Sequence, residues 1–182
     1  MQSAQPVSSG NRRTALGLSL KISVALCGPG LLAACGFRLR QPPEFAFTSI
    51  YAGLTPGSQI GIELKRYLAA LGKVELITDP ARQKEAPLIL EVLQEQREKV
   101  IVGGSAVGQV RELQLRLRFR FRVRTPKGKE LIPDTELLQQ RDQSYSEAFA
   151  LAKQAEEEQL YRNMQSDIVQ QVLRRLAAIR EL

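Results

Sequence analysis

The side chain best placed for covalent chemistry is the thiol of Cys35, which closes the stretch Leu32-Ala33-Ala34-Cys35. Small residues ahead of the cysteine fit a narrow peptidase cleft, and the thiolate can accept a diacylglyceryl group. This pattern is typical of a lipobox and predicts cleavage before Cys35, followed by acylation of the new amine. The alternative is a buried cysteine within an apolar helix.

The segment before Cys35 supports the lipobox. Arg12 and Arg13 form a basic region, and residues 22–32 form an apolar stretch. That stretch is shorter than the ~20 apolar residues needed to span a bilayer, and such a pattern is typical of a signal peptide. We therefore expect residues 1–34 to be removed after export by either the general or the twin-arginine route.

Other catalytic chemistry has little support. The 182-residue chain has no His, which excludes His general bases and His metal ligands. Of its two cysteines, Cys27 lies in the segment to be removed, so the mature chain cannot form an internal disulfide. Ser58, Ser105 and Ser144 have no His to activate them. We expect no enzyme, no metal, and no cofactor apart from a covalent lipid on Cys35.

A ladder of arginines is the strongest periodic feature. Between residues 113 and 124, apolar side chains alternate with polar ones, and five of the polar side chains are the ladder arginines Arg116, Arg118, Arg120, Arg122 and Arg124. Alternation of this kind predicts a β-strand with one apolar and one cationic face. At ~3.3 Å per residue, the ladder would be ~27 Å long.

Something anionic should face this ladder, because like charges repel. One interpretation is ion pairing with carboxylates on neighbouring strands, namely Glu91, Glu95, Glu98 and Asp142. The other is a docking face for lipid phosphates, which arginine binds bidentately. Both interpretations stay open, with pairing in the middle of the ladder and exposed arginines at its ends.

The elements around the ladder follow from periodicity and turn residues. Ser58 is a suitable N-cap and Gly72 a suitable C-cap for a helix between them. A bulge is expected in the strand before the ladder, because its alternation is irregular. The predicted strands cover residues 48–54, 74–78, 87–102, 110–124 and 137–146, and a final helix covers 147–179.

The resulting order is β-α-β-β-β-β-α. It predicts an α+β fold, a two-layer sandwich in which an antiparallel-rich mixed sheet packs two helices on one face. We expect residues 35–47 to be a lipidated N-terminus and spacer, and residues 48–182 to be a single domain.

Lys153, near the start of the final helix, is expected to pair with Glu156 or Glu157, three or four residues later. A resemblance gives it a second interpretation. The opening Cys35-Gly36-Phe37-Arg38-Leu39-Arg40, the order of elements, and Ala150-Leu151-Ala152-Lys153 ahead of a long helix resemble the LptE family of lipopolysaccharide-assembly lipoproteins.

The resemblance implies a non-enzymatic protein that sits in the lumen of the outer-membrane β-barrel LptD, assists assembly of that barrel and binds lipopolysaccharide. Lys153 matches the family's lipopolysaccharide-contacting lysine. The companion arginine of the hairpin loop has no clear match: alignment through Gly108-Gln109 places Ala106 there, and Arg111 follows. The candidate lipopolysaccharide-binding residues are Lys153, Arg111, Arg116, Arg118 and Arg120.

The predicted location and the net charge limit the classes of partner that this protein could bind. Gly36 stands where an Asp would favour inner-membrane retention, so we expect a lipid anchor on the periplasmic side of the outer membrane. The excess of 26 Lys and Arg over 19 Asp and Glu favours anionic partners. Export and a 5% aromatic content argue against nucleic acid. A generic outer-membrane scaffold for another anionic envelope component is the alternative function.

Overall fold

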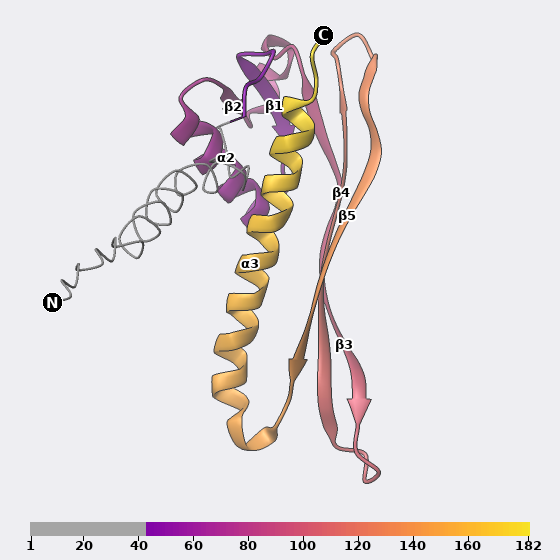
Figure 1. Ribbon diagram of the computed structural model, residues 1–182. Helices are drawn as coiled ribbons and strands as arrows, with labels where there is room; N and C mark the ends of the chain where they lie inside the picture. The colour runs from indigo at the N-terminus through magenta and orange to yellow at the C-terminus, as the bar shows by residue number, and fades with distance from the viewer. Residues whose placement is uncertain (1–42) are drawn as a thin grey trace, which may run out of the picture. The chain divides into compact units, whose positions relative to one another are not determined.

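The computed structural model describes residues 43–182 (Figure 1). In chain order the elements are β1 (Ser49–Gly53), α2 (Gln59–Leu71), β2 (Glu75–Ile77), the 3-10 turn η1 (Pro80–Glu85), β3 (Ile89–Gly104), β4 (Val110–Arg124), β5 (Glu130–Ser144), the 3-10 turn η2 (Glu147–Phe149) and α3 (Ala150–Ala177). The predicted order of strands and long helices is confirmed. Cys35 and the signal peptide lie outside the described residues, and the domain boundaries stay predictions.

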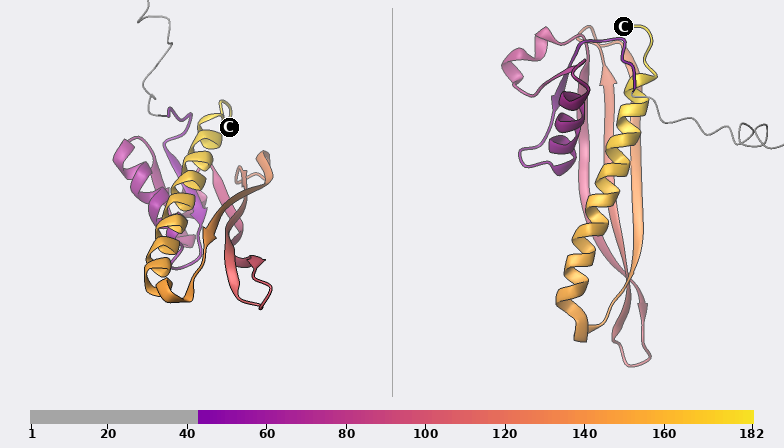
Figure 2. Two further views of the ribbon diagram at one scale, coloured as in Figure 1. Left: turned by 60° about the horizontal axis from the view of Figure 1, so that its bottom comes forward. Right: turned by 60° about the vertical axis from the view of Figure 1, so that its left-hand side comes forward.

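The five strands form one mixed sheet in the order β2-β1-β3-β4-β5. β1 pairs in parallel with β2 and β3, whereas β3, β4 and β5 pair antiparallel. α2 and α3 lie on the same side of this sheet (Figure 1, Figure 2). The predicted α+β two-layer sandwich is therefore confirmed. We call the sheet face toward the helices the inner face and the opposite one the outer face.

The core lies between the inner face and the helices. Alternate residues of β4, from Leu113 to Val123, are buried, as a strand with one apolar face requires. The helices bring their own apolar sides to the same cluster, which includes Ile60, Leu64 and Leu68 of α2 and Met164, Ile168 and Val172 of α3. The cationic side of β4 is thereby fixed on the outer face.

Both predicted caps of α2 are present. The Ser58 hydroxyl accepts a hydrogen bond from the Gly61 N–H at 2.8 Å. Gly72 ends the helix in the left-handed conformation, with φ of 64°, and its N–H donates to the carbonyls of Leu68 and Ala69.

The expected bulge in β3 is also confirmed, and it changes which side chains face outward. The register with β4 shifts between Val92 and Gln94. One extra residue reverses the alternation, so Glu91 lies on the outer face while Glu95 and Lys99, opposite the inward Phe119 and Leu115, lie on the inner face.

The structure differs from the prediction mainly in β5, which begins at Glu130 and not at residue 137. This earlier part of the strand contains Pro133, and β5 is an edge strand, where the missing N–H of proline is tolerated. The pairing with β4 shifts in this part of β5, between Ile132 and Thr135.

Smaller differences concern turns. Glu147–Phe149 form a 3-10 turn, so α3 itself begins at Ala150. The η1 turn was not predicted; the Asp79 carboxylate accepts a hydrogen bond from the Ala81 N–H at 2.9 Å and starts it. Among residues 43–182, none of the helices is long and apolar enough to cross a membrane.

Candidate functional site

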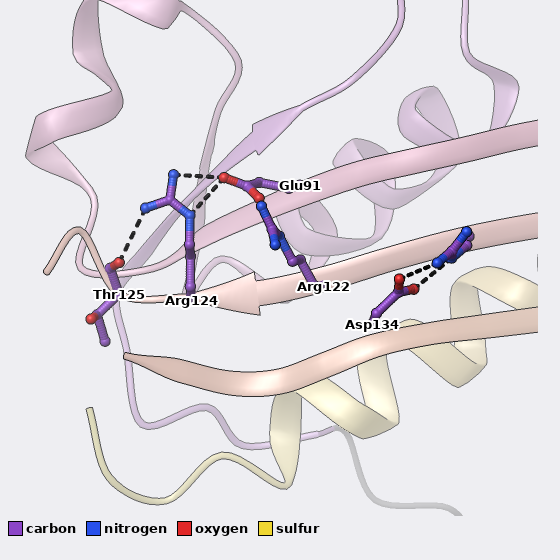
Figure 3. A network of polar contacts seen from close by, with 6 residues as sticks. Glu91, Arg122, Arg124, Thr125 and Asp134 are labelled. Carbon is purple, nitrogen blue, oxygen red and sulfur yellow. Dashed lines mark hydrogen bonds and ion pairs between the residues drawn. The ribbon is translucent and has the colours of Figure 1, made fainter. Parts of the chain in front are cut away.

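The arginine ladder occupies the outer face, and most of it is held by carboxylates of β3 and β5. Arg122 and Arg124 share Glu91, with Nε–oxygen distances of 2.5 and 2.6 Å (Figure 3). Arg120 forms two hydrogen bonds with the carboxylate of Asp134, one from Nε at 2.7 Å. These forked contacts are the strong geometry for arginine and carboxylate.

The other two arginines of the ladder differ in their partners. Arg118 donates from Nη1 to Glu136 at 2.5 Å and lies 3.9 Å from Glu98. Arg116 donates to the side-chain amide oxygen of Gln114 at 2.8 Å. Arg118 and Arg120 thus each have a carboxylate of their own, Arg122 and Arg124 share one, and Arg116 contacts a neutral amide. The expectation of exposed arginines at both ends is wrong for Arg124, which is paired with Glu91.

The ion pairs shift the pKa values of their members. Hydrogen bonding to Arg124, with a smaller contribution from Arg122, holds the pKa of Glu91 below its ordinary value. Arg120 lowers the pKa of Asp134 in the same way. The charged forms are thus stabilised on both sides of the ladder.

Two of the four expected ladder partners are confirmed and two are wrong. Glu91 and Glu98 pair with the ladder, but Glu95 is turned inward by the bulge and accepts a hydrogen bond from the Ser58 hydroxyl at 2.6 Å. Asp142 lies opposite Gln114 and accepts from its amide. Asp134 and Glu136 were missed because they lie in the part of β5 predicted as loop.

Lys153 lies on the helix side of the molecule, in the first turn of α3. Its Nζ contacts Glu156 at 2.8 Å, which confirms the expected pairing, and donates to the Ser144 hydroxyl at 3.0 Å. The buried Gln143 side chain donates to the Lys153 carbonyl at 2.8 Å and so fixes the start of α3 against the end of β5. Hydrogen bonding to Lys153 lowers the pKa of Glu156.

Lys153 lines a cavity of about 270 Å³. Its walls come from β3, the end of β5 with the segment after it, and the start of α3: Lys99, Gln143, Tyr145, Ala150, Lys153, Gln154 and Glu157. Lys99 forms an ion pair with Glu157 across it at 2.5 Å. The cavity therefore carries two lysines, each compensated by one glutamate.

Arg111 does not line this cavity. It is exposed near the hairpin loop and donates to the Gln109 side chain at 3.2 Å. The ladder arginines lie on the opposite face of the sheet. The structure thus brings Lys99, which sequence reasoning missed, into the cavity of Lys153. Alternation after a bulge would have pointed to Lys99, but the register of β3 could not be fixed from sequence.

Comparison with known proteins identifies the family. A family model described as "LptE: Lipopolysaccharide-assembly" matches residues 47–176. The chain belongs to the LptE family. LptE proteins are non-enzymatic lipoproteins of lipopolysaccharide assembly that are associated with the outer membrane. Among curated proteins, no sequence match was found.

Solved structures agree with LptE membership. The chain is similar to an uncharacterized lipoprotein B from Nitrosomonas europaea, with 33% identity, a TM-score of 0.64, and coverage of 79% of this chain and 91% of that one. It shares its fold with a minor lipoprotein from Acinetobacter baumannii (24% identity, TM-score 0.58, coverage 74% and 94%). A rare lipoprotein B from Shewanella oneidensis also shares the fold (21%, 0.58, 72% and 95%).

Proposed function

We propose that this LptE-family chain is a lipid-anchored outer-membrane protein that plugs the LptD β-barrel, assists its assembly and binds lipopolysaccharide during transport to the cell surface. The observation that carries the proposal is Lys153, the residue matching the family's lipid-contacting lysine, at the wall of a cavity with two lysines. Anchoring through an acylated Cys35 is part of the same proposal.

The outer face supports the plug role. It combines the ladder arginines with Glu91, Asp134 and Glu136 in a mixed-charge surface without a helix over its β4–β5 part in the described chain. Lumens of outer-membrane barrels are polar, so a charged sheet face can lie against the barrel wall without burying apolar groups. Arg116, Arg118 and Arg120 remain candidates for lipid or barrel contact.

A binding role fits the site better than catalysis. The sequence has no His, and the best placed serine, Ser58, is engaged as a helix cap and by Glu95. Within residues 43–182, no group of three or more His, Cys, Asp or Glu side chains could hold a metal ion.

Lipopolysaccharide binding is tested by neutralising Lys153. Losing one charge-assisted contact costs about 1.5 kcal/mol, so Lys153→Gln should weaken binding roughly tenfold at low salt, and less at high salt. Arg111→Gln tests the loop candidate separately. Titration of the purified full chain with lipopolysaccharide measures both effects. Unchanged affinity in the Lys153→Gln, Arg111→Gln double variant would refute this site.

Barrel binding is tested by gentle detergent extraction of the outer membrane. The proposed function predicts that LptD stays bound to this chain at a fixed ratio. Recovery of the chain without LptD, but with another anionic envelope component, would favour the generic scaffold.

A further inference from the structure

Lys99 belongs to a regular row of contacts between β3 and α3. Arg97 lies 4.9 Å from the ring centroid of Tyr161, whose hydroxyl donates to the Glu98 carbonyl at 2.8 Å. Two residues along β3, Lys99 contacts Glu157, one helical turn before Tyr161. Two residues of a strand rise about 6.6 Å and four residues of a helix about 6.0 Å, so successive contacts are spaced almost equally along β3 and α3. The next step places Ile101 level with Lys153.

The two lysines are held by contacts that an incoming anion can replace. Lys99 is 46% exposed and its partner Glu157 is 20% exposed, while Lys153 is 21% exposed and Glu156 is 46% exposed. Partly exposed pairs of this kind are weak, so exchanging a carboxylate for a phosphate costs little. A phosphate offers more acceptor oxygens than the carboxylate it replaces.

The start of α3 places partial positive charge at the cavity. Neither Ser146, before η2, nor Phe149, before α3, supplies a side-chain cap to the N–H groups that follow it. A helix N-terminus carries partial positive charge, and Ala150 of this first turn lines the cavity.

Exposed apolar side chains stand close in sequence to residues that line the cavity. Ile101 is 62% exposed, Phe149 is 64% exposed and Leu151 is 83% exposed. They lie within two residues of Lys99, of Ala150 and of Lys153, respectively. Of the three, Ile101 lies on the inner face of β3, as Lys99 does. Lysines and exposed apolar groups on the same elements fit an amphipathic anion better than a free phosphate ion.

We propose that Lys99 acts with Lys153 as a two-lysine clamp for a phosphate group in the head of a phosphorylated glycolipid, with Glu157 and Glu156 as counter-ions that the phosphate displaces. The clamp rests on the proposed lipopolysaccharide-binding function and adds to it a second cation, on β3. The exposed apolar residues contact the acyl part of the lipid.

Charge-neutral variants of the full-length chain test the clamp by titration with purified lipopolysaccharide at low salt. Lys99→Gln should weaken binding about five- to tenfold, and Lys99→Arg should restore most of the loss. Glu157→Gln should tighten binding several-fold, because it releases Lys99. The gain should disappear in the Lys99→Gln background, since no released lysine remains.

Matched controls separate the clamp from general electrostatics. Glu158→Gln removes a neighbouring charge on the same helix, and Lys129→Gln removes a lysine from the turn before β5; both should change affinity less than twofold. With dephosphorylated lipopolysaccharide, wild type and Lys99→Gln should bind equally. Inorganic phosphate alone should bind far more weakly than the lipid.

The failures are distinguishable. If wild type binds and Lys153→Gln weakens binding but Lys99→Gln does not, the clamp is wrong and the proposed function stands. Equal loss for Lys99→Gln with phosphorylated and dephosphorylated lipid would also overturn the clamp, because Lys99 would then act on another group. If wild type binds no lipopolysaccharide, the proposed function and the clamp both fail.

Discussion

Glu91 is the carboxylate that two arginines of the ladder share. Its two oxygens accept from Arg122 and Arg124, so one carboxylate offsets two cations that stand two residues apart on the same strand (Figure 3). Removing its charge leaves two neighbouring arginines facing each other without the anion between them. The cost should exceed that of a single exposed pair.

Glu91→Gln should lower the free energy of unfolding at pH 7 by about 1 kcal/mol. Because the folded pKa of Glu91 is lowered, its contribution is fully present above the unfolded pKa, near 4.5, and is lost as pH falls through the folded pKa. The difference between wild type and variant should therefore shrink toward pH 3. Urea unfolding at pH 7, 5 and 3 measures it.

Glu44→Gln, at an exposed position before β1, is the control and should change stability little at any of these pH values. A deficit for Glu91→Gln that is as large at pH 3 as at pH 7 would show that its ion pairs are not responsible.

The side-chain contacts that could be predicted from the sequence are those between residues close together in the chain. The Lys153–Glu156 pair follows from helical geometry, which fixes neighbours three residues apart. Glu95 and Lys99 could not be placed, because one bulged residue reverses the face of every side chain after it. Because of the same bulge, the sequence could not show that Lys99 lies beside Lys153.

At the scale of elements, α2 shows what sequence can predict well. Its boundaries are marked by a capping serine and a glycine with positive φ, both local features. β5 shows the opposite case, because the tolerance of Pro133 depends on the strand being at the edge of the sheet. That position is a property of the sheet and cannot be read from the residues around the proline.

Ser58 couples α2 to β3, since its hydroxyl accepts from the Gly61 N–H and donates to Glu95. Ser58→Ala removes the cap and leaves Glu95 without this donor, so it should destabilise the protein by about 1 to 2 kcal/mol. Thermal and urea unfolding followed by circular dichroism measure the loss.

Glu95→Ala separates the two contacts, because it keeps the cap and removes the acceptor of the serine hydroxyl. It should cost less than half as much as Ser58→Ala. Equal losses for the two variants would show that the strand contact, and not the helix cap, carries the effect.

In the whole molecule, the sheet separates two groups of basic residues. The ladder lies on the outer face and is largely compensated within the chain, whereas the lysine cavity lies on the helix side, where its glutamates can be displaced. Variants on one face should leave the other face's function intact, because the buried core of β4 separates them. Barrel contact and lipid binding should therefore be separable by mutation.

Anchoring is separable from both. Cys35 is eight residues before the first described residue, and the residues that line the lysine cavity come much later in the chain, from Lys99 to Glu157. Cys35→Ala should abolish acylation and yield a protein without acyl mass, either soluble or retaining its signal segment. Mass spectrometry and membrane fractionation measure this. The purified variant should still bind lipopolysaccharide within twofold of wild type, because the cavity is unchanged. A normally acylated product would refute the lipobox. Loss of lipopolysaccharide binding would show that the anchor forms part of the binding site.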